Sequence, residues 1–183
     1  MFSSRRSLLK TLIAGGAGMV LGNVVFAEGD APVDERRIEL FNTHTRETAN
    51  VVFRRGKEYD AASLATLRNI LRDHRNGESH DIDVGLYEQL SDLAIAAQRA
   101  PSYEIISGYR SPESNDKMSA KAGSGVAKKS LHMQGRAMDV RLKNCTCERL
   151  RDLAIAAAKG GVGYYRRSNF VHIDTGAFRT WVG

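Results

Sequence analysis

Apolar and polar residues alternate in two segments that follow a short polar stretch after residue 27. Ile38 and Leu40 occupy alternate positions in the first segment, and Val51 and Phe53 do so in the second. A period of two places alternate side chains on the same face of a β-strand. The pattern therefore predicts a β-hairpin over residues 37–56.

The apolar spacing changes to about 3.6 residues in three later segments, which predicts three helices. The first covers residues 61–76, with Asp60 as its N-cap and Gly77 after its end. The second covers residues 84–99 and the third residues 147–159. The predicted buried positions are Leu64, Leu67, Ile70 and Leu71 in the first helix, Leu86, Leu90, Leu93, Ile95 and Ala97 in the second, and Leu150, Leu153, Ala154 and Ala157 in the third.

Short strands complete the predicted fold. They cover residues 103–109, 136–142, 162–165 and 170–174, and the last two form a hairpin. Trp181 is expected to cap the core near the C-terminus. This order of elements predicts a single α+β domain with a mainly antiparallel central sheet and helices packed on it.

Two of these strands combine an apolar face with an ionisable one. In residues 136–142 Asp139 points away from the face of Met138 and Val140, and in residues 170–174 His172 and Asp174 share one face. An ionisable face on a short apolar strand needs a reason. Such residues can simply lie at a solvated sheet edge, but their combination with a third residue, His132, favours a metal site.

His132 lies seven residues before Asp139, and a turn at Gln134 and Gly135 can fold the two back together. Two imidazole nitrogens, one carboxylate oxygen and an open fourth position are what a catalytic zinc site requires. Bound zinc lowers the pKa of its water to about 7 and polarises a carbonyl group. His132, Asp139 and His172 are therefore the predicted ligands of one zinc ion per chain.

Four longer segments resemble one family of enzymes. They are LRDHRNGE (71–78), SGYRSPESN (107–115), GSGVAKKSLHMQGRAMDV (123–140) and GGVGYYRRSNFVHIDTG (160–176). Together they are similar to the murein endopeptidase K family of zinc metallopeptidases, which belongs to the D-Ala-D-Ala metallopeptidase and hedgehog-type fold superfamily. The resemblance covers residues 33–183. It implies zinc on the three residues above and hydrolysis of peptide cross-links in peptidoglycan.

The bond that is cleaved stays open at this point. A bond between two diaminopimelate residues is the first candidate. A D-Ala-D-Ala carboxypeptidase and a catalytically silent, zinc-containing module that binds peptidoglycan are the alternatives. The general base is open too, because the resembling dipeptidases place a Glu shortly before the last zinc His, and residues 167–171 contain no carboxylate. Asp174 is the nearest candidate, either as the base or as an acceptor that fixes the tautomer of His172.

The resemblance assigns Arg110 to the charge of the substrate or transition state. A guanidinium suits this task because it is permanently charged and binds oxygens in a fork, although Arg110 can also bridge a loop structurally. Ser107 and Tyr109 flank Arg110 as packing or hydrogen-bond partners, and Ser130 supports the site two residues before His132. We assign these three to substrate binding. Residues 109–130 are predicted to form a long polar loop, which either covers the substrate or is a solvated insertion.

The first 27 residues are predicted to be an export signal, and residues 28–183 the folded domain. Arg5 and Arg6 precede a weakly hydrophobic run of 16 residues, and Val25-Phe26-Ala27 fits a cleavage site. This pattern favours twin-arginine export to the periplasm over the general secretory route. The run is short for a bilayer span, so we expect no stable membrane anchor after cleavage.

Removing this leader takes away Arg5, Arg6 and Lys10 and no acid, so the net charge falls from +6 to +3. A charge of +3 with no basic stripe does not indicate nucleic-acid binding, and it suits an anionic cell-wall polymer. The expected partner is therefore peptidoglycan, and we expect a monomer. Cys145 and Cys147 can form a strained disulfide, stay reduced or pair between chains.

Overall fold

The computed structural model describes residues 34–121 and 125–183. The predicted leader and the predicted domain start at residue 28 lie outside the described residues. The elements are β1 (Glu35–Asn42), β2 (Thr48–Arg55), β3 (Glu58–Tyr59), α1 (Ala61–Ile70), α2 (Val84–Ala96), β4 (Ser102–Ser107), α3 (Pro112–Ser119), the 3₁₀-helix η1 (Leu131–Gln134), β5 (Ala137–Leu142), α4 (Cys147–Ala157), β6 (Gly161–Tyr165), β7 (Phe170–Asp174) and β8 (Arg179–Val182). Within these ranges, no helix is long and apolar enough to cross a membrane.

The strands form one sheet with the order β3-β2-β1-β4-β5-β7-β6-β8. β1 pairs with β4, and β6 with β8, in parallel, whereas the other neighbours are antiparallel. The predicted hairpin of β1 and β2 and the predicted hairpin of β6 and β7 are confirmed. The α+β class is confirmed as well, with a sheet that is mixed rather than purely antiparallel.

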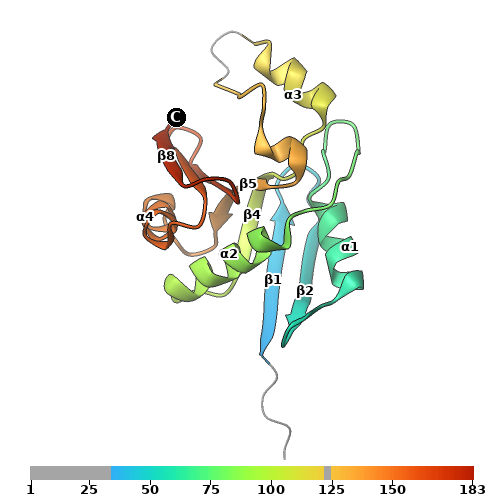
Figure 1. Ribbon diagram of the computed structural model, residues 1–183, viewed down its shortest axis with the longest axis vertical. Helices are drawn as coiled ribbons and strands as arrows, with labels where there is room; N and C mark the ends of the chain where they lie inside the picture. Colours follow the sequence, from blue (N-terminus) through green and yellow to red (C-terminus); the bar gives the residue numbers. More distant parts are fainter. Residues whose placement is uncertain (1–33, 122–124) are drawn as a thin grey trace, which may run out of the picture. The chain divides into compact units, whose positions relative to one another are not determined.

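Helices α1, α2 and α4 cover one face of this sheet (Figure 1). The core between them contains Phe53 from β2, Leu90 from α2, and Val140 and Ile173 from the central strands, each of them fully buried. Burial of apolar side chains of this size contributes roughly 1.5–3 kcal/mol each. The alternation predicted for β5 and β7 is confirmed, because their apolar residues face this core and their ionisable residues face the other way.

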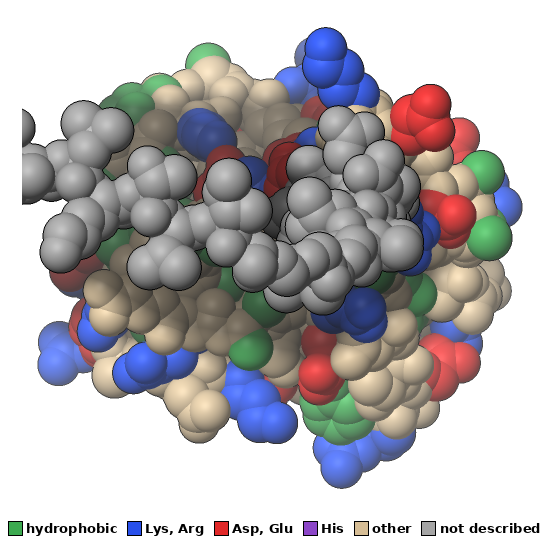
Figure 2. Space-filling view, turned by 90° about the horizontal axis from the view of Figure 1, so that it is seen from below, with side chains coloured by type: hydrophobic (Ala, Val, Ile, Leu, Met, Phe, Trp, Pro, Cys, Tyr) green, Lys and Arg blue, Asp and Glu red, His purple; other side chains and the backbone are tan. Residues whose placement is uncertain are grey.

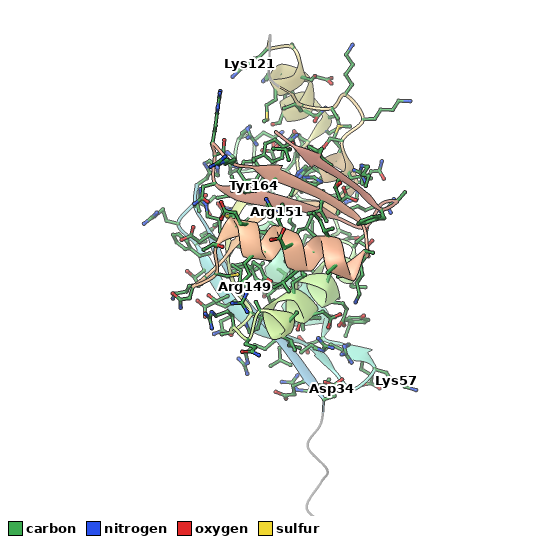
Figure 3. The ribbon with its side chains drawn as sticks, turned by 90° about the vertical axis from the view of Figure 1, so that its left-hand side faces the viewer. Asp34, Lys57, Lys121, Arg149, Arg151 and Tyr164 are labelled. Atoms are coloured by element: carbon green, nitrogen blue, oxygen red, sulfur yellow. The ribbon has the colours of Figure 1, made fainter. Side chains whose placement is uncertain are left out.

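Polar contacts fix how the helices pack on each other and on the sheet. The Arg149 side chain of α4 donates a hydrogen bond to the carbonyl of Ala97 at the end of α2, at 3.2 Å. The guanidinium of Arg151 lies 4.8 Å from the centre of the Tyr164 ring in β6 (Figure 3). Basic and acidic side chains are also interspersed over the face shown in Figure 2. The contacts of Arg149 and Arg151 orient α4 across the strands that carry the ionisable face.

Two predicted buried positions are wrong, and one predicted capping residue lies elsewhere. Ile95 in α2 is 62% exposed, and Ala157 is exposed at the last turn of α4. Both lie on the solvent side of helices that are buried along a narrower stripe than predicted. Trp181 lies on β8 against the ionisable face of the sheet and not over the core. Cys147 is buried in the core and Cys145 is partly exposed, and both are free thiols.

Helix α1 ends at Ile70, six residues before its predicted end. The side-chain amide of Asn42 donates to the Ile70 carbonyl at 2.9 Å, which satisfies one of the last carbonyl groups of the helix. The chain then turns, and Asp73 accepts hydrogen bonds from the backbone nitrogen and the hydroxyl of Ser111, at 2.9 and 3.0 Å. This distant partner ends the helix where the local pattern predicted that it would continue.

The predicted long loop over residues 109–130 contains helix α3 and, at its end, Ser130 as the cap of η1. Ser111 caps α3, Pro112 occupies its first turn, and Lys117 pairs with Glu113 one turn away at 2.5 Å. These polar signals are present in the sequence. Helix α3 has almost no apolar stripe, so the spacing of apolar residues does not predict it.

Asp73 carries a prediction about stability and pH. Burial alone would raise its pKa, but hydrogen bonds from Ser114, Ser111 and the Arg75 nitrogen hold the pKa of Asp73 at about 2. A carboxylate with a depressed pKa stabilises the fold above its unfolded pKa of about 3.9, and this contribution is lost as the pH falls through about 2. Asp73→Asn should therefore lower the free energy of unfolding by about 2 kcal/mol at pH 7, measured by urea denaturation.

The difference between Asp73→Asn and the original protein should shrink below pH 4 and vanish near pH 2. Asp81→Asn is the matched control, because the Asp81 side chain is 87% exposed and forms a surface ion pair with Arg68. A stability loss in Asp73→Asn that is the same at pH 7 and pH 2 would contradict this account of the carboxylate.

Candidate metal centre and its cleft

The register of the sheet aligns the ionisable residues in one row. Ser107 on β4 lies opposite Asp139 on β5, and Asp139 lies opposite His172 on β7. The row continues through Gly163 on β6 to Trp181 on β8. Residues directly opposite each other point to the same face of a sheet. Strands far apart in the sequence thus bring a carboxylate and an imidazole side by side.

His132 reaches the same place from η1, which precedes β5. Ser130 caps η1, with its hydroxyl accepting from the backbone nitrogen of His132 at 3.4 Å. Gly135 ends η1 with a φ of +64°, and a Cβ atom there would lie 2.0 Å from the carbonyl of Asp81. A residue with a side chain does not fit this turn, so the predicted turn at Gly135 depends on glycine.

The three predicted metal ligands converge. Nδ1 of His172 lies 2.9 Å, and Nε2 of His132 3.3 Å, from Oδ1 of Asp139. The two ring nitrogens are 3.2 Å apart. The donor atoms all lie within 4.8 Å of one another, and the three side chains are buried. Two nitrogens and one oxygen so placed match the donor set that zinc takes in catalytic sites.

In each imidazole, the ring nitrogen that points away from the cluster (the outer nitrogen) is hydrogen-bonded to another residue. This contact orients the other ring nitrogen (the inner nitrogen) toward the cluster. Nδ1 of His132 lies 2.7 Å from the carbonyl oxygen of Gly108, and Nε2 of His172 lies 3.0 Å from Oδ2 of Asp174. Because a carbonyl can only accept, Nδ1 of His132 carries the hydrogen and its Nε2 offers a lone pair inward. Asp174 likewise accepts from Nε2 of His172, so a cation between the inner atoms would take the place of a proton on Nδ1. Hydrogen bonds of this kind are a regular feature of metal-binding histidines.

The charges of the cluster favour a cation. Burial alone would raise the pKa of Asp139, but the two imidazoles hold that pKa well below its usual range. Burial opposes protonation of His172, yet Asp139 and Asp174 outweigh it and raise the pKa of His172 to about 8. Burial lowers the pKa of His132 despite the nearby Asp139. Two carboxylates therefore surround one ring, and a cation between the inner atoms compensates them.

An open cleft of about 470 Å³ leads to this cluster. Its walls include Arg110, Ser130, Tyr165, Arg179 and Trp181. Arg110 is 6% exposed, and its Nη2 lies 4.0 Å from Oδ2 of Asp139. Its Nη1 donates to the side chain of Asn115 in α3 at 3.3 Å, and its buried Nε has no partner among the described residues. The guanidinium of Arg110 therefore lies at the cleft wall beside the metal ligands.

Asn115 connects this arginine to the far wall of the cleft. Its side-chain nitrogen donates to the carbonyls of Ala127 and Lys128, both at 3.2 Å. Residues 125–127, together with Lys129, line the same cleft. The described part of the predicted loop is thus tied to Arg110 through α3 and forms one side of the cleft.

Asp174 lies behind His172 and is fully buried. It binds the ring nitrogen that points away from Asp139 and His132. Of the two roles that the sequence left open for Asp174, this position favours the acceptor that fixes His172. Among the described residues that line the cleft, Asp139 is the one carboxylate.

The three residues assigned to substrate binding lie at different places. Ser130 lines the cleft. Ser107 is buried in the row beside Asp139, and its hydroxyl has no hydrogen-bond partner among the described residues. Tyr109 does not line the cleft, because its ring stacks on that of His80 at 5.1 Å and its backbone nitrogen donates to Leu71. Ser107 and Tyr109 thus lie among the residues that surround the site and not among those that line the cleft.

The cleft residues that the sequence did not assign to the site include Tyr165, Arg179 and Trp181. Trp181 donates from its indole nitrogen to the Tyr165 hydroxyl at 3.1 Å, and its ring lies 5.1 Å from that of His172. Tyr165 and Phe170 stack at 4.5 Å across the β6–β7 hairpin. The alternation along β6 and β7 was a signal that could have placed Tyr165 on the face of His172.

Comparisons with known proteins identify the family of this chain. A family model described as "Peptidoglycan L,D-endopeptidase MepK" matches residues 30–181. The peptidoglycan L,D-endopeptidase MepK of Escherichia coli (strain K12) is 40% identical over 176 residues, covering 94% of this chain and 95% of its own. A Haemophilus influenzae protein named "probable peptidoglycan L,D-endopeptidase MepK" is 34% identical over 178 residues, covering 95% of both chains. No solved structure matches significantly.

The family match extends beyond half of the chain, and both relatives are covered almost completely. The matched range includes His132, Asp139 and His172, which the fold brings together. The chain therefore belongs to the peptidoglycan L,D-endopeptidase MepK family of M15 peptidases.

Proposed function

We propose that this protein is a zinc-dependent peptidoglycan endopeptidase that hydrolyses peptide cross-links of the cell wall. The observation that carries the proposal is the convergence of His132, Asp139 and His172 at the base of an open cleft. The bond proposed is the amide between two diaminopimelate residues. The names of the relatives, which are called L,D-endopeptidases, support this choice of substrate.

The donor set fits zinc. Nε2 of His132, Nδ1 of His172 and Oδ1 of Asp139 would hold the ion, because Gly108 and Asp174 occupy the outer ring nitrogens. A bound zinc ion supplies an activated water and polarises the carbonyl of the scissile bond. Asp139 would balance part of the charge of the ion, while its Oδ2 lies 4.0 Å from Nη2 of Arg110.

Arg110 would bind the oxygen on which negative charge develops. Its Nε is buried and unpartnered among the described residues, and its Nη1 is held by Asn115, so the guanidinium is fixed before the substrate arrives. A preorganised donor of this kind stabilises a transition state without reorganisation. Tyr165 and Trp181 provide an aromatic wall of the cleft beside His172.

Digestion of purified sacculi tests the function. Zinc-loaded protein should release monomers from dimers that are linked through two diaminopimelate residues, seen by chromatography and mass spectrometry of the muropeptides. Release of free D-Ala from pentapeptides with all cross-links intact would make the protein a carboxypeptidase. Binding to sacculi with no product of either kind would make it a silent binding module.

We also propose that the protein reaches the periplasm by twin-arginine export. Arg5 and Arg6 before a weakly hydrophobic run support this route. Replacing both residues by Lys should leave uncleaved precursor in the cytoplasm, detected by fractionation and immunoblotting. Normal periplasmic delivery of this double variant would favour the general secretory route.

A further inference from the structure

Arg179 on the last strand makes a two-pronged contact with Asp174. Its Nη2 lies 2.6 Å from Oδ2 and its Nη1 3.1 Å from Oδ1 of the carboxylate. The backbone nitrogens of Gly161 and Gly176 donate to the same Oδ1, at 2.9 and 2.8 Å. A fork of two parallel hydrogen bonds fixes both the position and the plane of a carboxylate.

This contact crosses a strand. β8 pairs with β6, and β6 lies between β8 and β7, which carries Asp174. Arg179 lies opposite Gly161 in the register, and Trp181 lies opposite Gly163. A Cβ atom on Gly161 would lie 2.4 Å from Oδ2 of Asp174 and 2.5 Å from Nη1 of Arg179. The absence of a side chain at residue 161 is what allows Arg179 to reach Asp174.

Gly163 does the same for Trp181. A Cβ atom on Gly163 would lie 2.4 Å from the indole ring, which continues over β6 to the ring of His172, at 5.1 Å. The guanidinium of Arg179 lies 5.1 Å from the centre of the same indole. Two glycines in GGVGYY therefore open β6 at two successive positions of one face, and two side chains of β8 fill the gaps.

We propose that Arg179 is a positioning residue for the metal centre, which acts on His172 through Asp174. This inference rests on the proposed metal site. By holding both oxygens of Asp174, Arg179 keeps Oδ2 against Nε2 of His172 and so maintains the tautomer that offers Nδ1 to the metal. Gly161 is part of the same device, because it provides the space for the contact. Removal of such outer partners typically costs 10–100-fold in metal affinity.

The alternative is that Arg179 only attaches β8 to the rest of the sheet. Its side chain is 47% exposed, so the pair with Asp174 need not stabilise the fold strongly. The two roles predict changes in different measurable quantities. A merely structural Arg179 changes the free energy of unfolding, whereas a positioning Arg179 changes metal affinity and the His172 ring in a protein that is still folded.

The test is a titration of Zn²⁺ into metal-free protein against a competing chelator. Arg179→Ala should bind Zn²⁺ 10–100-fold more weakly than the original protein, and Arg179→Lys should lie between the two, because it keeps the charge without the fork. Gly161→Ala should weaken binding as well, although it removes no charged group. Arg167→Ala is the matched control, since Arg167 is exposed on the β6–β7 turn, and it should bind Zn²⁺ normally.

A second measurement uses the metal-free protein itself. The ring Nε2–H of His172 should be visible by NMR as a slowly exchanging proton bound to Asp174, and its exchange should accelerate in Arg179→Ala and in Asp174→Asn. Unchanged Zn²⁺ affinity and an unchanged ring proton in a folded Arg179→Ala would overturn the proposal. Neither readout uses peptidoglycan, so a failure of the proposed function to appear with sacculi is distinguished from a failure of this inference.

Discussion

His132→Ala and His172→Ala should each lose bound zinc and peptidoglycan hydrolysis together. Each change removes one of the three donors that converge within 4.8 Å, and the two donors that remain rarely hold zinc tightly. Metal content after dialysis against a mild chelator, measured by atomic emission, and the products of sacculus digestion should both fall to background. The expected effect is the largest of any substitution considered, because it removes the metal itself.

His44→Ala is the matched control for these variants. His44 is exposed and stacks on His74 at 3.8 Å, and it does not line the cleft. It should retain zinc and activity. Circular dichroism separates loss of metal from loss of fold in the two ligand variants. Stoichiometric zinc retained by both folded variants after dialysis would show that the ligands have been assigned incorrectly.

Arg110→Ala should retain zinc and lose most of the turnover. Its guanidinium is not a metal ligand, but it lines the cleft and its Nη2 lies 4.0 Å from Oδ2 of Asp139. Loss of one preorganised oxyanion donor costs roughly 3 kcal/mol, which corresponds to a fall in kcat of about a hundredfold or more. The measurement is kcat and KM on a purified cross-linked dimer, together with zinc content.

Arg110→Lys separates charge from geometry. Lys keeps a positive charge but lacks the planar fork that binds Asn115 and that we propose binds the substrate, so it should restore only part of the activity. Arg68→Ala, on the exposed side of α1, should have no effect. A rise in KM with an unchanged kcat in Arg110→Ala would indicate that Arg110 binds the ground state of the substrate and does not act on the transition state.

The position of Asp174 bears on whether this residue acts as the general base. In the dipeptidases that the chain resembles, a Glu before the last ligand is the base, and the equivalent positions 167–171 contain no carboxylate. Asp174 is held by Arg179 and by two backbone nitrogens on the far side of His172. We therefore expect Asp174→Asn to reduce metal affinity. If Asp174 were instead the general base, the same substitution would slow turnover and leave metal affinity unchanged.

Local pattern was sufficient for the parts of this fold in which a residue's direction depends on its neighbours in the chain. Asp139 and His172 were placed on the ionisable faces of their strands, because side chains alternate along any strand. The turn before β5 was predicted from Gly135, whose left-handed conformation suits glycine. The same reasoning failed for α3, whose capping and ion-pair signals are polar, and for the end of α1, which is set by Asn42 and Ser111 from distant segments.

The sequence by itself determined which residues can form the centre: two histidines and a carboxylate, with an arginine nearby. Only the tertiary structure decided how they act together. Strand register, set by hydrogen bonds between distant segments, placed Asp139 opposite His172 and Trp181 opposite Gly163. The carbonyl of Gly108 and the carboxylate of Asp174 oriented the imidazoles, and the gap at Gly161 let Arg179 reach across a strand. Contacts of this kind join residues that are far apart in the chain, so no local period or spacing specifies them.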